Sequence, residues 1–131
     1  MKETSLILLI VCWLLSQKTY AQRFPDFKFR YLTMKDGLSN DYVTDIVQDK
    51  NGFIWLSTAN GLNRYNGNRI KHFFHDPKNP NSLLSNEIWG LLVDHKNRIW
   101  MNTPDGIGCY DQFTDSFINY TYHRDDKSGL P

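Results

Sequence analysis

Cysteine is nearly absent from this sequence. The 131 residues contain 2, and Cys12 lies in an N-terminal segment that we expect to be removed from the mature protein. Cys109 would then be the only thiol left, which excludes an intrachain disulfide. Because no His and Asn pattern of a catalytic thiol accompanies it, we interpret Cys109 as a buried structural residue. Stability must therefore come from the packing of apolar side chains.

An excess of charge of either sign is also missing. The formal net charge is +1 at pH 7, and removal of Lys2, Glu3 and Lys18 with residues 1–21 brings it to 0. Proteins that bind nucleic acid carry a basic surface that neutralises phosphates. The composition therefore argues against nucleic acid as a partner of this segment.

Motifs of common catalytic and metal sites are lacking as well. The sequence contains no nucleophile elbow, phosphate-binding loop, zinc-ligand spacing or convincing pair of acids. His72 and His75 are three residues apart in a predicted strand and would point to opposite faces. His95 falls in a predicted turn and His123 in a linker. We expect a segment that is not an enzyme and that uses no metal or cofactor.

One apolar run, Leu6–Leu15, lies near the N-terminus. It follows a short charged start and precedes Ala21, a small residue suited to a cleavage site. This arrangement is typical of a secretory signal peptide, which we assign to residues 1–21. The run is shorter than the roughly 17–25 residues that span a bilayer. We therefore expect export to the periplasm, with an uncleaved membrane anchor as the alternative.

The rest of the sequence contains an internal repeat. Asp49–Tyr65 aligns without a gap with Asp94–Tyr110, at an offset of 45 residues. The identical pairs are Asp49/Asp94, Ile54/Ile99, Trp55/Trp100, Thr58/Thr103, Gly61/Gly106 and Tyr65/Tyr110. A repeat of roughly 40–50 residues made of short strands is typical of a β-propeller blade. We interpret the shared residues as structural positions of the repeat.

Each repeat divides into four predicted strands, separated by turns rich in Asp, Asn and Gly. In the first repeat these strands are Tyr42–Gln48, Phe53–Thr58, Leu62–Tyr65 and Arg69–His75. In the second they are Ile88–Val93, Ile99–Thr103, Gly106–Tyr110 and Ser116–Tyr122. The sequence predicts an all-β fold: a β-propeller fragment with two four-stranded antiparallel blades, 37–81 and 82–128. Residues 129–131 would begin a third repeat.

Residues 22–36 precede the first repeat. Within them, Phe27–Thr33 alternates aromatic and charged residues, the pattern of a half-buried strand. It stands before Gly37-Leu38 as Phe117–Tyr122 stands before Gly129-Leu130. We therefore expect it to be the last strand of a ring-closing blade whose other strands lie outside this sequence. An additional edge strand on the first blade is the alternative.

Tryptophan occupies two kinds of position. Trp55 and Trp100 share a place in the second strand of each repeat, so we expect them to pack between neighbouring sheets. Trp89 has no such counterpart, since Thr44 holds its place in the first repeat. We expect Trp89 near the mouth of a central channel, where it is the candidate ligand-binding residue. Simple variation in packing is the alternative.

Asp36–Asn40 together with Asp49–Asn66 resembles the two-component regulator propeller repeat, and Asp76–Leu83 is similar to its usual lead-in. This family is found in periplasmic sensors of hybrid two-component systems, typically of Bacteroidetes. The resemblance implies two propellers of about seven blades each, an immunoglobulin-like domain, a membrane helix, a histidine kinase, a receiver and often a DNA-binding domain. It also implies detection of polysaccharide fragments. No ligand residue carries over, because the motif is structural.

The second repeat departs from the family pattern at Arg98, Asn102 and Gly108. The main hypothesis is an exported sensor segment of a hybrid two-component histidine kinase that detects glycan fragments and regulates polysaccharide-utilisation genes. Its expected partners are an oligosaccharide, the remaining propeller blades and a second copy of the parent protein. One alternative is a fragment of a propeller glycan lyase or glycosidase. Another is a gene remnant, or a short protein that builds its ring from several copies.

Overall fold

A computed structural model describes residues 28–121. The chain divides into a unit of residues 1–30, of which 28–30 are described and form no helix or strand, and a unit of residues 31–131. All helices and strands given below belong to the second unit. The predicted signal peptide, His123 and residues 129–131 lie outside the described part of the chain.

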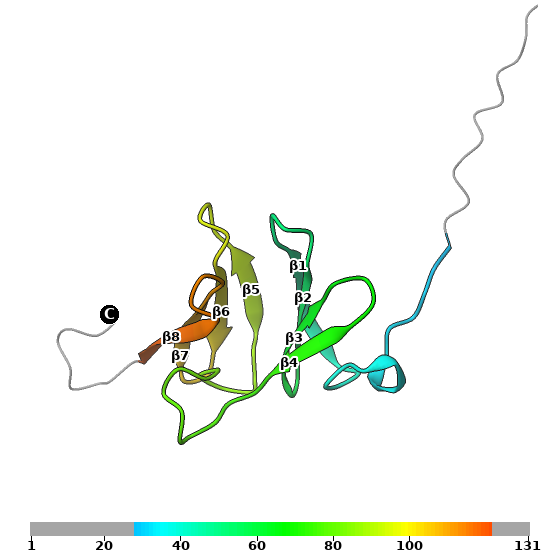
Figure 1. Cartoon of the computed structure of the whole chain (residues 1–131). Helices are drawn as coiled ribbons and strands as arrows, with labels where there is room; N and C mark the ends of the chain where they lie inside the picture. The colour runs from blue at the N-terminus through cyan, green and yellow to red at the C-terminus, as the bar shows by residue number, and fades with distance from the viewer. Residues whose placement is uncertain (1–27, 122–131) are drawn as a thin grey trace, which may run out of the picture. The chain divides into compact units, whose positions relative to one another are not determined.

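The second unit contains two four-stranded antiparallel sheets, shown in Figure 1. The first blade consists of β1 (Val43–Gln48), β2 (Ile54–Thr58), β3 (Gly61–Tyr65) and β4 (Ile70–Phe73). The second consists of β5 (Gly90–Val93), β6 (Ile99–Thr103), β7 (Gly106–Asp111) and β8 (Ser116–Thr121). In both blades the strands pair in sequence order. The predicted fold class is confirmed, and each predicted strand end lies within two residues of the observed one.

The first turn of each blade is built by an aspartate. Oδ1 of Asp49 and Oδ1 of Asp94 each accept hydrogen bonds from the backbone N–H groups two and four residues later. The turn closes on Gly52 at φ 86° in the first blade and on Asn97 at φ 65° in the second. Glycine and asparagine both tolerate this left-handed conformation. The two sequences therefore form one turn by different residues.

The expected N-terminal strand, Phe27–Thr33, is not observed in its described part. Residues 28–33 form no strand, and Phe29 and Tyr31 are exposed. A strand needs a hydrogen-bonding neighbour, and the neighbours expected for this one are not in the sequence. Its assignment to a ring-closing blade stays a prediction. A single 3-10 turn, η1 (Met34–Asp36), instead leads into the first blade.

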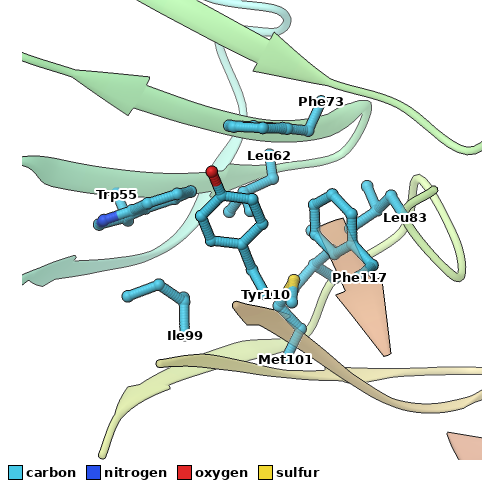
Figure 2. Packing of buried hydrophobic residues seen from close by; sticks show 9 residues of the cluster. Trp55, Leu62, Phe73, Leu83, Ile99, Met101, Tyr110 and Phe117 are labelled. Atoms are coloured by element: carbon cyan, nitrogen blue, oxygen red, sulfur yellow. The ribbon is translucent and has the colours of Figure 1, made fainter. Parts of the chain in front are cut away.

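The core lies between the two blades (Figure 2). Its buried members are Trp55, Leu62 and Phe73 from the first blade, and Leu83, Ile88, Ile99, Met101, Tyr110 and Phe117 from the second repeat. The rings of Trp55 and Tyr110 lie 5.0 Å apart between centroids, and those of Phe73 and Phe117 lie 5.6 Å apart. Each blade thus buries one of its faces against the other, as stacked repeats require.

Polar contacts join β1 to β5 and to the residues directly before β5. A register irregularity between Val43 and Asp45 interrupts the pairing of β1 with β2 at Thr44. Oγ1 of Thr44 donates to the carbonyl of Ile88 at 2.8 Å. Oδ2 of Asp45 accepts from the N–H of Leu91 at 2.8 Å. The bulge therefore turns a polar side chain of β1 toward the next blade.

Trp100 differs from the expectation. Trp55 is fully buried between the blades, whereas Trp100 is half-buried and stacks on Tyr120 of its own blade, with 6.0 Å between ring centroids. Successive residues of a strand point to opposite faces. Met101 faces the first blade in the core, so Trp100 points to the other face of β6. Among residues 28–121, no further sheet covers that face.

Candidate ligand-binding surfaces

The repeated aspartate and tryptophan form a hydrogen-bonded pair in both blades. Nε1 of Trp55 donates to Oδ2 of Asp49 at 2.9 Å, and Nε1 of Trp100 donates to Oδ2 of Asp94 at 3.0 Å. Each carboxylate therefore joins its own turn to the second strand of its blade. The carboxylate of Asp94 also pairs with Arg98, at 2.7 Å from its NH2. These contacts engage both repeated carboxylates within their own blades.

The remaining repeat positions also make contacts within their blades. Oγ1 of Thr58 donates to the carbonyl of Gly61, and Oγ1 of Thr103 donates to that of Gly106. A Cβ atom at Gly106 would lie 2.2 Å from the carbonyl oxygen of Tyr120, so only glycine fits there. Tyr65 and Tyr110 occupy equivalent places in the third strands. These repeat positions thus lie at equivalent places in the two blades.

Trp89 lies directly before β5 and is 55% exposed. Its backbone N–H donates to the carbonyl of Asn102 at 2.8 Å, and its Nε1 donates to Oε1 of Glu87 at 2.9 Å. The indole therefore has a polar partner and a free face. Its role as a ligand-binding residue stays a prediction, and Trp89 lines neither of the two depressions described next.

A cleft of about 420 Å³ lies where the turns of the two blades meet. It is formed by the β1–β2, β5–β6 and β7–β8 turns, and we name it the turn cleft. Its lining residues are Lys50, Asn51, Lys96, Asn97, Arg98, Asp111, Gln112 and Phe113. Ligand-binding clefts in proteins have volumes of roughly 300–1,000 Å³. The turn cleft is therefore large enough for a small sugar.

Hydrogen bonds across the blade boundary fix the walls of the turn cleft. The N–H of Lys50 donates to Oδ1 of Asn97 at 2.7 Å. Nδ2 of Asn51 donates to Oε1 of Gln112 at 2.9 Å. Nε2 of Gln112 donates to the carbonyl of Asn97 at 2.8 Å and to Oδ2 of Asp49 at 3.2 Å. Gln112 thus links the turn cleft to the buried aspartate of the first blade.

The sequence did not single out the turn cleft. Its residues come from three separate turns of the two repeats, and none belongs to the identical pairs of the repeat. Phe113 is the one residue that offered a signal, because an aromatic side chain is unusual in a turn rich in polar residues. It is 93% exposed.

A second depression, of about 360 Å³, lies beside the half-buried face of Trp100. It is mainly apolar, lined among others by Leu92, Trp100 and Ile107. Leu92 pairs with Trp100 across β5 and β6 and is exposed. Trp55, at the equivalent place in the first blade, packs against another blade. The apolar depression thus lies beside Trp100, whereas the second blade packs beside Trp55.

Charged and phenolic groups also bridge the blades on the β4 and β8 side. The hydroxyl of Tyr110 donates to the carboxylate of Asp115, and Nζ of Lys71 lies 3.0 Å from the same carboxylate. NH1 of Arg64 donates to the Tyr110 hydroxyl at 3.5 Å. The hydrogen bond from Tyr110 and the interaction with Lys71 lower the pKa of Asp115. Burial and the Asp115 bond raise the pKa of Tyr110 above its usual range.

Cys109, His72 and His75 have defined environments in the structure, whereas the side chain of His95 is exposed. Cys109 is buried, and desolvation raises its thiol pKa, which disfavours the reactive thiolate. A ring nitrogen of His72 bonds the carbonyl of Gly37, and one of His75 bonds that of Leu83. Residues 28–121 contain no group of three His, Cys, Asp or Glu that could hold a metal ion. The same residues contain no helix long and apolar enough to cross a membrane.

Sequential four-stranded antiparallel sheets that stack face to face, one per 45-residue repeat, define the protein class: these are blades of a β-propeller. Residues 37–60 and 82–105 match the family model of the two component regulator propeller. The two repeats of this chain are therefore two-component regulator propeller repeats.

Similar proteins were found among solved structures and curated sequences. The extracellular domain of BT3049 from B. thetaiotaomicron, described as a hybrid two-component system, superposes with a TM-score of 0.70 and 33% identity. The match covers 77% of this chain and 14% of that domain. A histidine kinase of Formosa agariphila is 40% identical over 58 residues, which are 44% of this chain and 4% of that protein. This chain thus spans a small part of both relatives.

Proposed function

We propose that this chain is an exported, ligand-sensing propeller segment of a hybrid two-component histidine kinase. The main support is the pair of adjoining blades that match the two component regulator propeller model. They also superpose, with a TM-score of 0.70, on an extracellular domain described as part of such a system. The signal-peptide pattern of residues 1–21 supports export to the periplasm. In this proposal the segment performs no catalysis, and the kinase reaction belongs to other parts of the parent protein.

The proposed ligand is a glycan fragment, and the proposed output is transcription of polysaccharide-utilisation genes. Ligand binding would act by favouring one of two arrangements of the propeller, because a ligand shifts an equilibrium only through a difference in affinity between states. The polar contacts between the blades supply a boundary whose packing can differ between states. The remaining blades would pack on the apolar depression, and a second copy of the parent would complete the sensor.

Transcription in the host tests this proposal. Deletion of the gene should abolish the induction of one set of polysaccharide-utilisation genes by one class of oligosaccharide, and a plasmid copy should restore it. A fusion of alkaline phosphatase to the C-terminal end of the chain should be active, because that enzyme needs an oxidising compartment. Unchanged induction for every oligosaccharide of a broad panel would contradict the sensing role. An inactive fusion would contradict export.

A further inference from the structure

We propose that the turn cleft is a binding site for an anionic oligosaccharide, one carrying a carboxylate or a sulfate. This inference rests on the proposed function and gives it a place and a ligand class. The sugar would lie between the turns of the two blades, with Lys96 and Lys50 facing its negative group and Phe113 facing its ring.

The charges of the turn cleft favour an anion. Arg98 is already neutralised by Asp94 at 2.7 Å, whereas Nζ of Lys50 donates to a backbone carbonyl, that of His95. The Lys96 side chain makes no ion pair or hydrogen bond with any residue of 28–121. Asp111 is the one acid among the lining residues of the turn cleft. Two ammonium groups therefore face one carboxylate, and a negatively charged ligand can form a charge-assisted hydrogen bond without breaking an existing ion pair.

The other lining groups suit a sugar. Phe113 is 93% exposed at the edge of the turn cleft, although burial of an aromatic side chain away from water is favourable. A pyranose ring can cover such a side chain with its apolar face. Its hydroxyl groups can form hydrogen bonds with Oδ1 of Asn51 and Nδ2 of Asn97, the amide atoms that the contacts between the blades do not engage. These amides are held in place by Gln112 and Lys50, so the site is largely preformed.

The site also has a route to the rest of the propeller. Gln112 contacts Asn51 and Asn97 in the walls of the turn cleft and donates to Asp49, which in turn accepts from the buried Trp55. A ligand that pulls the two turns together therefore acts on the boundary between the blades. Binding at this place would couple to the packing of the blades, as a sensor requires.

Binding to the purified full chain tests the proposal, with digalacturonic acid and 3′-sulfolactose as anionic probes. Their neutral counterparts are the dimethyl ester of digalacturonic acid and lactose. We expect at least one anionic probe to bind about tenfold more tightly than its neutral counterpart, and to bind more weakly as the salt concentration rises. Preference for the uronate or for the sulfate identifies the charged group.

Two substitutions place the binding in the turn cleft. Lys96→Gln and Phe113→Ala change exposed side chains that make no hydrogen bond or ion pair with residues 28–121, and each should weaken binding of the preferred probe by about tenfold. Lys78→Gln, an exposed lysine in the loop between the blades, is the matched control and should leave binding unchanged. Circular dichroism of each variant confirms that it remains folded.

Equal affinity for charged and neutral probes, an unchanged affinity in Lys96→Gln, or no binding of any probe would each overturn the proposal. In those cases the transcription experiment still decides the sensor function separately. Induction that persists in a strain whose chromosomal gene carries Lys96→Gln would likewise contradict the turn cleft as the binding site, while the sensor role would remain supported.

Discussion

The two blades contain the same aspartate and tryptophan pair, yet their tryptophans have different environments. Trp55 is fully buried because Tyr110 and other residues of the second blade cover it. Trp100 makes the equivalent hydrogen bond to Asp94 but is half-buried, with only its own blade beside it. The comparison separates contacts that a repeat makes within itself from burial that a neighbour provides. Four predictions, ordered by expected effect, test this distinction.

Truncation of the two tryptophans should produce the largest difference. Trp55→Ala removes a side chain at the centre of the core and should lower the free energy of unfolding by about 3–5 kcal/mol. Trp100→Ala removes a half-buried ring and should cost about 1–2 kcal/mol. Urea unfolding of the full chain, followed by circular dichroism, measures both values. Equal losses would show that the second blade does not bury Trp55 as observed.

Removal of the aspartates should differ in the same direction. Asp49→Ala leaves the buried Nε1 of Trp55 without an acceptor, and this should cost about 1–3 kcal/mol. Asp94→Ala exposes the equivalent nitrogen of Trp100 to water, so we expect a smaller loss. The comparison is made by urea unfolding at neutral pH. A larger loss for Asp94→Ala would indicate that Arg98 depends on its ion pair more than the geometry suggests.

The contacts of Asp115 with Tyr110 and with Lys71 of the other blade should make the free energy of unfolding depend on pH. The folded-state pKa of Asp115 is lowered, so its contribution is present above the unfolded pKa of about 3.9 and is lost as pH falls below it. Since Asp115 and Lys71 are both partly exposed, we expect about 0.2–1 kcal/mol. Asp115→Asn should therefore destabilise the chain at pH 7 and have a smaller effect at pH 3. An equal effect at both values would contradict the lowered pKa.

The smallest effect is expected for Gly52→Asn, in the first turn of the first blade. Gly52 has φ 86° and nothing within 4 Å of its Cβ position, while Asn97 holds the equivalent place at φ 65°. Gly52→Asn should therefore be nearly neutral, whereas Gly52→Ala should cost about 1 kcal/mol because alanine is strained at positive φ. Differences in urea midpoint measure both. A loss for Gly52→Asn as large as for Gly52→Ala would show that the two turns are not interchangeable.

Much of the fold could be predicted because its determinants are local. Alternating apolar residues and Asp/Asn/Gly turns placed all eight strands within two residues, and the repeat revealed which tryptophan and aspartate correspond. The expected N-terminal strand is not observed in residues 28–33, because strand formation requires a partner, and its assignment to a ring-closing blade stays a prediction. The expected packing of Trp100 between two sheets is likewise not observed among residues 28–121, where no further sheet covers its face.

The turn cleft could not be predicted from the sequence. Lys50, Lys96 and Phe113 come from three turns, and they line one cleft only because the two blades stack in register. Trp89, the residue chosen from its departure from the repeat, lies before β5 with its indole bonded to Glu87, and its role stays a prediction. A departure from a repeat shows that a position is unusual, and the stacking shows which side chains meet.

The sequence alone therefore determined the class of fold, the repeat length and the strand order, and it showed which aspartate and which tryptophan of the two repeats correspond. These features depend on residues close together along the chain, where backbone geometry decides which groups can meet. Only the tertiary structure decided that Trp55 is buried while Trp100 is half-buried, that Gln112 contacts Asp49, and that Lys50 and Phe113 share a cleft. These features depend on how one sheet packs against another. The 45-residue repeat requires such packing, but it does not specify which side chains line the boundary between the sheets.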